Sequence, residues 1–293
     1  RGRAPGLLDR RGEGDHRGNR LELDRICRAI GLDLVSVWPD GGSVADLGRA
    51  SGAGVVVALP NGGRAGALLA ARTGARLVEA AVPFGPGATA AFVRSLGAAT
   101  GRAAQADAFA DAEMVRVVDS VKRIHSGRFA GRTAAFIGDP WMTPGFCDIA
   151  SRLGLDVRFL VALARSRPGL DPGDGLPAGA PEIAWQPHAM AFGEIVEGRR
   201  TDLLVHPWLN DFGERAVGRV EFGFPSRDSH FCSRRPFLGF DGFLNFVDRL
   251  ASSLGDYRSD ASMRSATGEP SADSPRRSMK TTEGINRDSS AKT

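Results

Sequence analysis

Short apolar runs alternate with stretches of helical pattern along most of this 293-residue chain. Residues 54–60 (GVVVALP) and 131–140 (GRTAAFIGDP) are apolar runs bounded by turn residues, which is typical of strands buried on both faces. Helices are predicted directly after these runs, at residues 63–73 and 142–153. Apolar strands that alternate with helices predict parallel sheets covered by helices.

The remaining elements follow the same pattern. Further strands are expected at residues 32–38, 76–82, 155–163, 182–185, 202–207 and 219–225. Further helices are expected at residues 21–30, 89–101, 107–126, from 188 onward, and 239–254. A loop dense in Pro and Gly is expected at residues 166–181, and Asp139 is expected to cap the helix after its strand.

The predicted fold class is α/β, with two doubly wound, Rossmann-like parallel-sheet domains that carry helices on both faces. The expected parts are an irregular N-terminal arm (1–20), a first Rossmann-like domain (21–106), a bridging helix with a second Rossmann-like domain (107–255) and a disordered tail (256–293). The tail is rich in Ser and Thr. Its few apolar residues cannot bury enough surface to offset the entropy lost on ordering.

Charge and composition exclude several classes of partner. The net charge is +4, but the arginines are scattered and are not interleaved with aromatic residues, so no nucleic-acid partner is expected. No apolar run approaches the ~20 residues of a membrane span, and no signal peptide opens the sequence, so we expect a cytoplasmic protein without a membrane partner. Cys27, Cys147 and Cys232 are too widely spaced for a disulfide framework or a CxxC metal site.

The most informative segment is GRVEFGFPSRDSHFCSRRPFLGFDGFLNFVDRL, residues 218–250. It predicts a buried strand, then a polar loop with His230 and Cys232, then a helix that opens with Gly-Phe-Asp-Gly. Open α/β sheets bind ligands at the carboxyl ends of their strands, so this loop is the expected site. Imidazole and thiolate are suitable iron ligands, so we predict metal or cofactor contacts at His230 and Cys232. The alternative is a polar loop that ligates nothing.

Four further residues are candidates for the same site. Arg227, Arg234 and Arg235 flank the loop, where guanidinium groups would bind an anionic cluster or a carboxylate-bearing cofactor. Solvated surface arginines are the alternative. His206 follows a predicted strand and is expected to face the cleft between the domains. The glycine-rich loop at residues 83–89 lacks both the GxGxxG pattern and a P-loop lysine, so a tight turn is expected there and not a nucleotide site.

Three stretches resemble the nitrogenase component 1 family and occur in its order. Residues 78–101 are similar to the family's strand that ends in Pro-x-Gly before a Thr and a basic helix. Residues 119–140 resemble its Asp-Ser-His helix and the following strand that ends in Gly-Asp-Pro, although Val121 stands where His is usual. The strand TDLLVHPW, together with residues 218–250, completes a resemblance that covers residues 21–255.

This resemblance implies a subunit of a heteromeric, ATP-dependent reductase. Family members pair with a second component 1 subunit as heterodimers or heterotetramers, and they take electrons from an ATP-dependent iron–sulfur protein. The family includes nitrogenase subunits, cofactor-assembly scaffolds and dark-operative protochlorophyllide reductases. The resemblance also implies an iron–sulfur or iron–molybdenum-type cluster shared with a partner subunit. Alignment on Pro236 places Ser229 at the family's cofactor-ligating His, with His230 one residue away.

One departure from the family pattern concerns the bridging cluster. Family subunits usually begin with a further domain whose cysteines ligate that cluster, and those cysteines are absent from this chain. Cys27 alone cannot replace them, because a cluster needs several thiolates. We therefore expect a truncated or divergent subunit that is not active alone. The alternatives are a non-catalytic scaffold for iron–molybdenum cofactor assembly, a truncated inactive remnant, and an unrelated two-domain binding protein of the periplasmic type.

Overall fold

The computed structural model describes residues 3–5, 16–38, 44–125, 127–165, 175–197, 199–207, 216–223 and 233–254. Arg1–Gly255 belong to one unit of the chain and Asp256–Thr293 to another. The predicted tail lies outside the described residues. The boundary expected near residue 106 lies inside the first unit and stays a prediction.

The first part of the chain forms two pairs of short parallel strands. β1 (Arg3–Pro5) pairs with β2 (Asp33–Ser36), and β3 (Val55–Ala58) pairs with β4 (Arg76–Glu79). All four residues of β3 are buried, as its apolar sequence predicted. β1 differs from the irregular arm expected over residues 1–20, because a three-residue strand is too short to show an alternating pattern.

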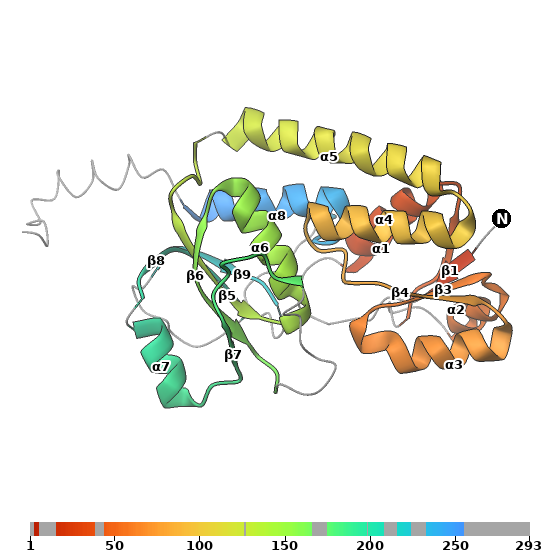
Figure 1. Ribbon diagram of the computed structural model, residues 1–293, viewed down its shortest axis with the longest axis horizontal. Helices are drawn as coiled ribbons and strands as arrows, with labels where there is room; N and C mark the ends of the chain where they lie inside the picture. Colours follow the sequence, from red (N-terminus) through yellow and green to blue (C-terminus); the bar gives the residue numbers. More distant parts are fainter. Residues whose placement is uncertain are drawn as a thin grey trace, which may run out of the picture. The chain divides into compact units, whose positions relative to one another are not determined.

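Helices alternate with these strands (Figure 1). They are α1 (His16–Ala29), α2 (Val44–Gly48), α3 (Gly63–Thr73), α4 (Pro86–Thr100) and α5 (Ala103–His125), with 3₁₀ turns η1 (Arg49–Gly52) and η2 (Pro60–Gly62). α1 begins five residues before the predicted helix. Its polar first turn shows no apolar periodicity, but Asn19 is buried there and accepts a hydrogen bond from the backbone N of Phe237 at 2.8 Å.

The second part of the chain forms a five-stranded parallel sheet in the order β7-β6-β5-β8-β9. Its strands are β5 (Thr133–Gly138), β6 (Asp156–Ala162), β7 (Ile183–Trp185), β8 (Thr201–His206) and β9 (Ala216–Glu221). The accompanying helices are η3 (Pro140–Met142), α6 (Thr143–Leu153), α7 (Ala189–Glu197) and α8 (Gly239–Ser253). This order is that of a doubly wound sheet, so the α/β fold with parallel sheets is confirmed.

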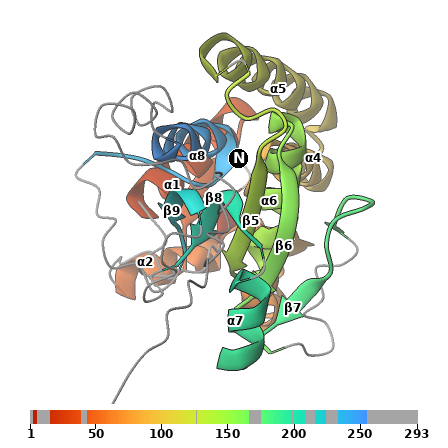
Figure 2. The ribbon, with the colours of Figure 1, turned by 90° about the vertical axis from the view of Figure 1, so that its left-hand side faces the viewer.

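The two faces of the five-stranded sheet bury different side chains. Ile137 and Leu204 pack in one cluster with Val196 of α7. Phe136 and Val205, the alternating residues on the same two strands, join the larger core that includes α6 and α8. α7 stands apart from α6 and α8 (Figure 2). Because both faces of β5 are covered, this strand is apolar and buried from Ala134 to Gly138, as predicted.

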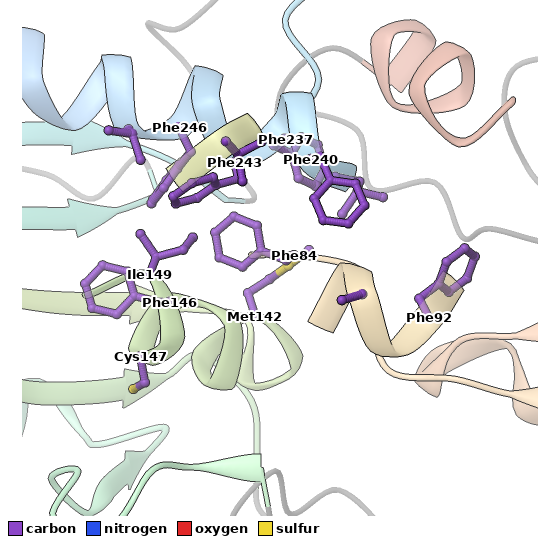
Figure 3. Close-up of a cluster of buried hydrophobic side chains, with 14 of the residues drawn as sticks. Phe84, Phe92, Met142, Phe146, Cys147, Ile149, Phe237, Phe240, Phe243 and Phe246 are labelled. Carbon is purple, nitrogen blue, oxygen red and sulfur yellow. The ribbon is translucent and has the colours of Figure 1, made fainter. Parts of the chain in front are cut away.

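Phenylalanine rings from separate segments meet in the larger core (Figure 3). Phe84, in the loop before α4, stacks on Phe222 with ring centroids 5.2 Å apart. It also meets Phe246 of α8 edge-on, again at 5.2 Å. Burying a ring of this size contributes roughly 1.5–3 kcal/mol to the stability of the fold. These contacts therefore attach the loop before α4 firmly to the five-stranded sheet.

The Gly-Phe-Asp-Gly sequence positions the start of α8. Gly239 has a φ of +80°, and a Cβ at this position would overlap the side chain of Glu22. The backbone N of Gly239 donates to the carbonyl oxygen of Pro83 at 2.9 Å, and that of Asp241 donates to Glu22 at 3.1 Å. Position 239 therefore needs a glycine for two reasons: its φ lies in the left-handed region, and α8 packs closely against α1 there.

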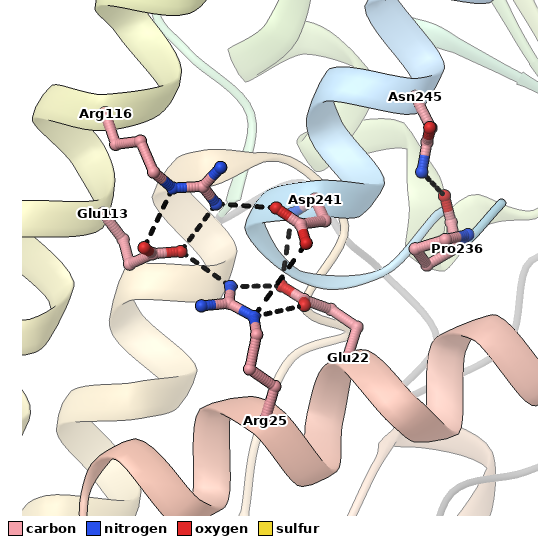
Figure 4. A network of polar contacts seen from close by, with 7 residues as sticks. All are labelled: Glu22, Arg25, Glu113, Arg116, Pro236, Asp241 and Asn245. Carbon is pink, nitrogen blue, oxygen red and sulfur yellow. Dashed lines mark hydrogen bonds and ion pairs between the residues drawn. The ribbon is translucent and has the colours of Figure 1, made fainter. Parts of the chain in front are cut away.

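An ion network joins α1, α5 and α8 (Figure 4). Arg25 binds Glu22 through two hydrogen bonds of 2.7 and 2.8 Å and reaches Glu113 at 2.6 Å. Arg116 binds Glu113 and Asp241, each at 2.7 Å. Burial alone would raise the pKa of Glu113, but the hydrogen bonds from Arg116 and Arg25 lower it below the usual value. Glu113 therefore stays ionised at neutral pH.

Candidate functional site

A cleft of about 460 Å³ opens where β3 and β4 end. One wall comes from residues that follow these strands, including Leu59 and Val82, and the other from Trp141 and Pro144 at the start of η3 and α6. Glu79 is the one charged residue among the described residues that line the cleft. Carboxyl ends of parallel strands are the usual place for ligands in open α/β sheets, so this cleft is the principal candidate site.

Glycines let the two walls approach each other. Gly85 (φ +86°) precedes α4, and Gly145 lies in the first turn of α6, where a Cβ would overlap the carbonyl oxygen of Phe84. The backbone N of Gly87 donates to the carboxylate of Asp148 at 2.9 Å. This N–H at the start of α4 is therefore already bonded, in keeping with the tight turn expected for residues 83–89.

Trp141 is held at the cleft by the turn that ends β5. Asp139 follows the strand, and its Oδ1 accepts a hydrogen bond from the backbone N of Trp141 at 2.9 Å. Asp139 therefore caps the 3₁₀ turn η3, whereas α6, the helix it was predicted to cap, begins after Met142. The indole Nε1 of Trp141 is buried and has no hydrogen-bond partner among the described residues. Leaving a buried N–H group without a hydrogen bond costs free energy of folding. This N–H group belongs to a residue that lines the candidate site.

His206 ends β8, next to β5 at the point where the sheet order reverses. Its Nδ1 lies 2.6 Å from the carbonyl oxygen of Pro207, to which it donates. Burial lowers the pKa of His206 below the usual value, and the positive charge of Arg219 adds to this effect. The imidazole is therefore neutral at pH 7. His206 is not among the described residues that line the cleft, and its predicted role stays a prediction.

A second hollow, of about 520 Å³, runs along β9 and is strongly polar. We call it the β9 groove; its charged or titratable residues are Arg219, Glu221, Arg235, Asp248, Arg249 and His125. Arg235 was predicted as a site residue, and the structure places it here. Arg234 is exposed and is not among the described residues that line either hollow.

The predicted ligand loop itself lies outside the described residues. Arg227, Ser229, His230 and Cys232 all belong to this part of the chain, which follows Gly223. Their predicted contacts with a metal or cofactor therefore stay predictions.

The two described cysteines are buried free thiols. Cys27 and Cys147 are both 2% exposed, and burial raises the pKa of Cys27 to about 12 and that of Cys147 to about 11, so both stay as thiols at neutral pH. Cys147 is a core residue. Among the described residues there is no group of three or more His, Cys, Asp or Glu side chains that could hold a metal ion.

Sequence reasoning missed Trp141, Arg219 and Arg249. Trp141 had a detectable signal, because it follows a Gly-Asp-Pro turn at the end of an apolar strand, where ligand sites are expected. Arg219 lies between two buried residues of β9, and Arg249 precedes the buried Leu250 of α8. Nothing in the local pattern showed that the two arginines converge.

No described helix is both long and apolar enough to cross a membrane.

Two solved structures described as nitrogenase Cp1 are similar to this chain. The one at pH 6.5 has a TM-score of 0.69 and 17% identity, over 87% of this chain and 60% of that chain. The one at pH 5 has a TM-score of 0.61 and 14% identity, over 87% and 57%. At these identities the likeness shows the fold alone. The chain spans less than two thirds of the length of either structure.

The family comparison covers most of the sequence. No curated protein matches the chain. The model of the family described as nitrogenase component 1 type oxidoreductase matches residues 12–254, which include both candidate hollows. The chain therefore belongs to the nitrogenase component 1 type oxidoreductase family.

Proposed function

We propose that this chain is one subunit of a heteromeric, ATP-dependent reductase and that its cleft forms part of the site where a cofactor or substrate is held. The cleft at the ends of β3 and β4 is the observation that supports this most directly. A second component 1 subunit would contribute the remaining part of the site. An ATP-dependent iron–sulfur protein would supply the electrons.

The described lining suits binding better than metal coordination. Leu59, Val82 and Pro144 give the cleft apolar walls, which exclude water and strengthen any polar contact made inside it. Glu79 is the one carboxylate of the described lining, which includes neither imidazole nor thiolate. The described residues thus do not fit an iron–sulfur or iron–molybdenum cluster by themselves, and we assign no reaction step to such a group.

The ligands that we propose for a cluster lie in the segment after β9. They are His230 and Cys232, with Ser229 and Arg227 beside them. Arg234 and Arg235, which follow this segment, would balance the charge of an anionic cluster. His206 would act as a neutral imidazole at the adjacent strand end.

A scaffold for metal-cofactor assembly is the second candidate function. An apolar cleft with few ligands favours it, because a scaffold must hold a cofactor and release it, and needs no path for electrons. An inactive remnant is the third candidate, and it predicts neither metal binding nor a stable complex with a partner.

The test is anaerobic co-expression with a second component 1 subunit, followed by iron and sulfide analysis of the purified complex. We expect stoichiometric iron that is lost in a Cys232→Ala, His230→Ala double variant. A Cys147→Ala, His188→Ala variant removes the same residue types elsewhere and should keep its iron. Full iron retention in the first variant would exclude the proposed ligands, and failure of the two subunits to associate would contradict the heteromeric reductase.

A second measurement separates the reductase from the scaffold. The iron-loaded complex is mixed with the ATP-dependent iron–sulfur protein and ATP, and the oxidation state of its metal is followed by electron paramagnetic resonance. ATP-dependent reduction supports the reductase. Transfer of the iron to an apo-protein acceptor, without reduction, supports the scaffold.

A further inference from the structure

We propose that the β9 groove binds a small oxyanion, that is, a carboxylate or phosphate group of a small molecule. The groove is separate from the cleft but shares Arg235 with the cluster site proposed above. The proposal does not depend on the reductase function, because its test measures binding of a free anion and not iron content or reduction. A groove of about 520 Å³ falls in the range of roughly 300–1,000 Å³ that small-molecule sites occupy.

Three arginines and one histidine reach this groove from four parts of the chain. Arg219 comes from β9, Arg235 from the segment before α8, Arg249 from α8 itself, and His125 from the last turn of α5. Guanidinium groups bind carboxylate and phosphate oxygens through paired hydrogen bonds. Three of them in one hollow are therefore suited to a ligand with several such oxygens.

Arg249 is held in place within the groove. It donates to the backbone carbonyl oxygen of Glu221, and its guanidinium carbon lies 5.9 Å from the ring centroid of Phe222. Burial lowers the pKa of Arg249 to about 10; the carboxylate of Glu221 opposes this effect, and the charge of Arg235 adds to it. A bound anion would stabilise this partly desolvated cation, and little side-chain freedom would be lost on binding.

The acidic groups of the groove offset its positive charge only in part. Glu221 and Asp248 face the three arginines. Asp248 already pairs with His125, whose Nε2 lies 2.9 Å from its Oδ1. Arg219 and Arg235 are the exposed arginines of the groove, so an anion arriving from solvent would meet these two side chains first.

The test is isothermal titration calorimetry on the full chain at low ionic strength, with pyrophosphate and citrate as separate probes. We expect saturable binding of at least one probe to one site, weakened at least tenfold in an Arg219→Ala, Arg235→Ala double variant. Both arginines are exposed, so the variant should fold. Arg72→Ala, on the exposed side of α3, is the matched control and should leave binding unchanged.

The two probes distinguish the sources of the oxyanion. Tighter binding of pyrophosphate identifies a phosphate ligand, and tighter binding of citrate a carboxylate ligand. Arg249→Lys keeps the charge but removes the planar fork, and it should weaken the preferred probe by about fivefold or more. The proposal is overturned if neither probe binds saturably, or if the double variant and Arg72→Ala bind equally well.

Discussion

The cleft and the β9 groove are similar in size but opposite in chemistry. The cleft is lined mostly by apolar residues, with Glu79 as the one charged side chain among those described, whereas the groove gathers three arginines, a histidine and two carboxylates. Both are built on parallel strands of one α/β fold. The cleft lies at strand ends, where the fold itself creates a hollow, and the groove lies along the outer described strand of the five-stranded sheet.

This difference indicates two different kinds of ligand. The cleft would hold a largely apolar group that is screened from water, as its lining indicates. The groove would hold an exposed anion, and its affinity should fall as salt concentration rises. The two hollows share a core, because Phe84 of the cleft's loop stacks on Phe222, which also contacts Arg249 of the groove. Mutations can therefore affect both hollows or only one.

Replacing Phe84 with alanine should have the largest effect and should disturb both hollows. Phe84 is fully buried, and such truncations cost about 3–5 kcal/mol. We expect the free energy of unfolding, measured by urea denaturation, to fall by this amount. Leu68→Ala on α3, where the side chain is 54% exposed, is the control and should change it by less than about 0.5 kcal/mol. Equal stability of both variants would show that the shared core is not as tightly packed as described.

Replacing Gly145 with alanine should disturb the cleft alone. The added Cβ overlaps the carbonyl oxygen of Phe84, so the two walls must move apart, and overpacking of this kind costs about 1–3 kcal/mol. Gly48→Ala is the matched control, because a Cβ there meets nothing within 4 Å. We expect urea denaturation to show a loss for Gly145→Ala only, with pyrophosphate or citrate binding in the groove unchanged. Unchanged stability would contradict the close approach of the walls.

The fold was largely predictable because its local signals agree with its tertiary structure. α3 has its predicted bounds, 63–73, since turn residues precede it and Gly74 ends it in a left-handed conformation. Other boundaries depend on distant contacts. α1 begins early because buried Asn19 binds the segment before α8, and β9 ends at Glu221, before the predicted residue 225. A single sequence shows local pattern but not which residues meet across 200 positions.

The candidate site was predicted less completely, for a related reason. The ends of strands could be located, so the position of a cleft followed from fold class. Its apolar lining could not, because Leu59 and Val82 look like ordinary core residues in the sequence. The convergence of Arg219 with Arg249 depends on how α8 packs beside β9, which no local motif encodes.

Replacing Glu113 with glutamine should loosen the helices beside the groove. Glu113 receives hydrogen bonds from Arg25 and Arg116, which are each more than a third exposed, so we expect a loss of about 1–2 kcal/mol. The pKa of Glu113 is lower in the folded state, so its contribution is present above the unfolded pKa of about 4.5 and is lost as pH falls through the folded value. Urea denaturation at pH 7 and at pH 3 checks both points.

The outcome has a clear direction. The difference in stability between the native chain and Glu113→Gln should be largest at neutral pH and should shrink in acid. Asp107→Asn, an exposed partner of Arg94, is the control and should change stability little at either pH. A difference that grows as pH falls would contradict an ionised Glu113.

The smallest effect on stability should come from replacing Trp141 with phenylalanine, and it is the sharpest test of the cleft. The change removes a buried N–H that has no partner among the described residues, and it also removes some apolar contact, so we expect stability to change by less than about 1 kcal/mol. Trp38→Phe is a matched control, since its Nε1 is likewise buried without a partner among those residues, but it does not line the cleft. Fluorescence titration with Nile red, a neutral apolar dye, should show weaker binding for Trp141→Phe and unchanged binding for Trp38→Phe. Because the groove prefers anions and the cleft is apolar, pyrophosphate should not displace the dye. Displacement of the dye by pyrophosphate would contradict binding of apolar ligands in the cleft. Equal effects of the two tryptophan variants on dye binding would contradict it as well.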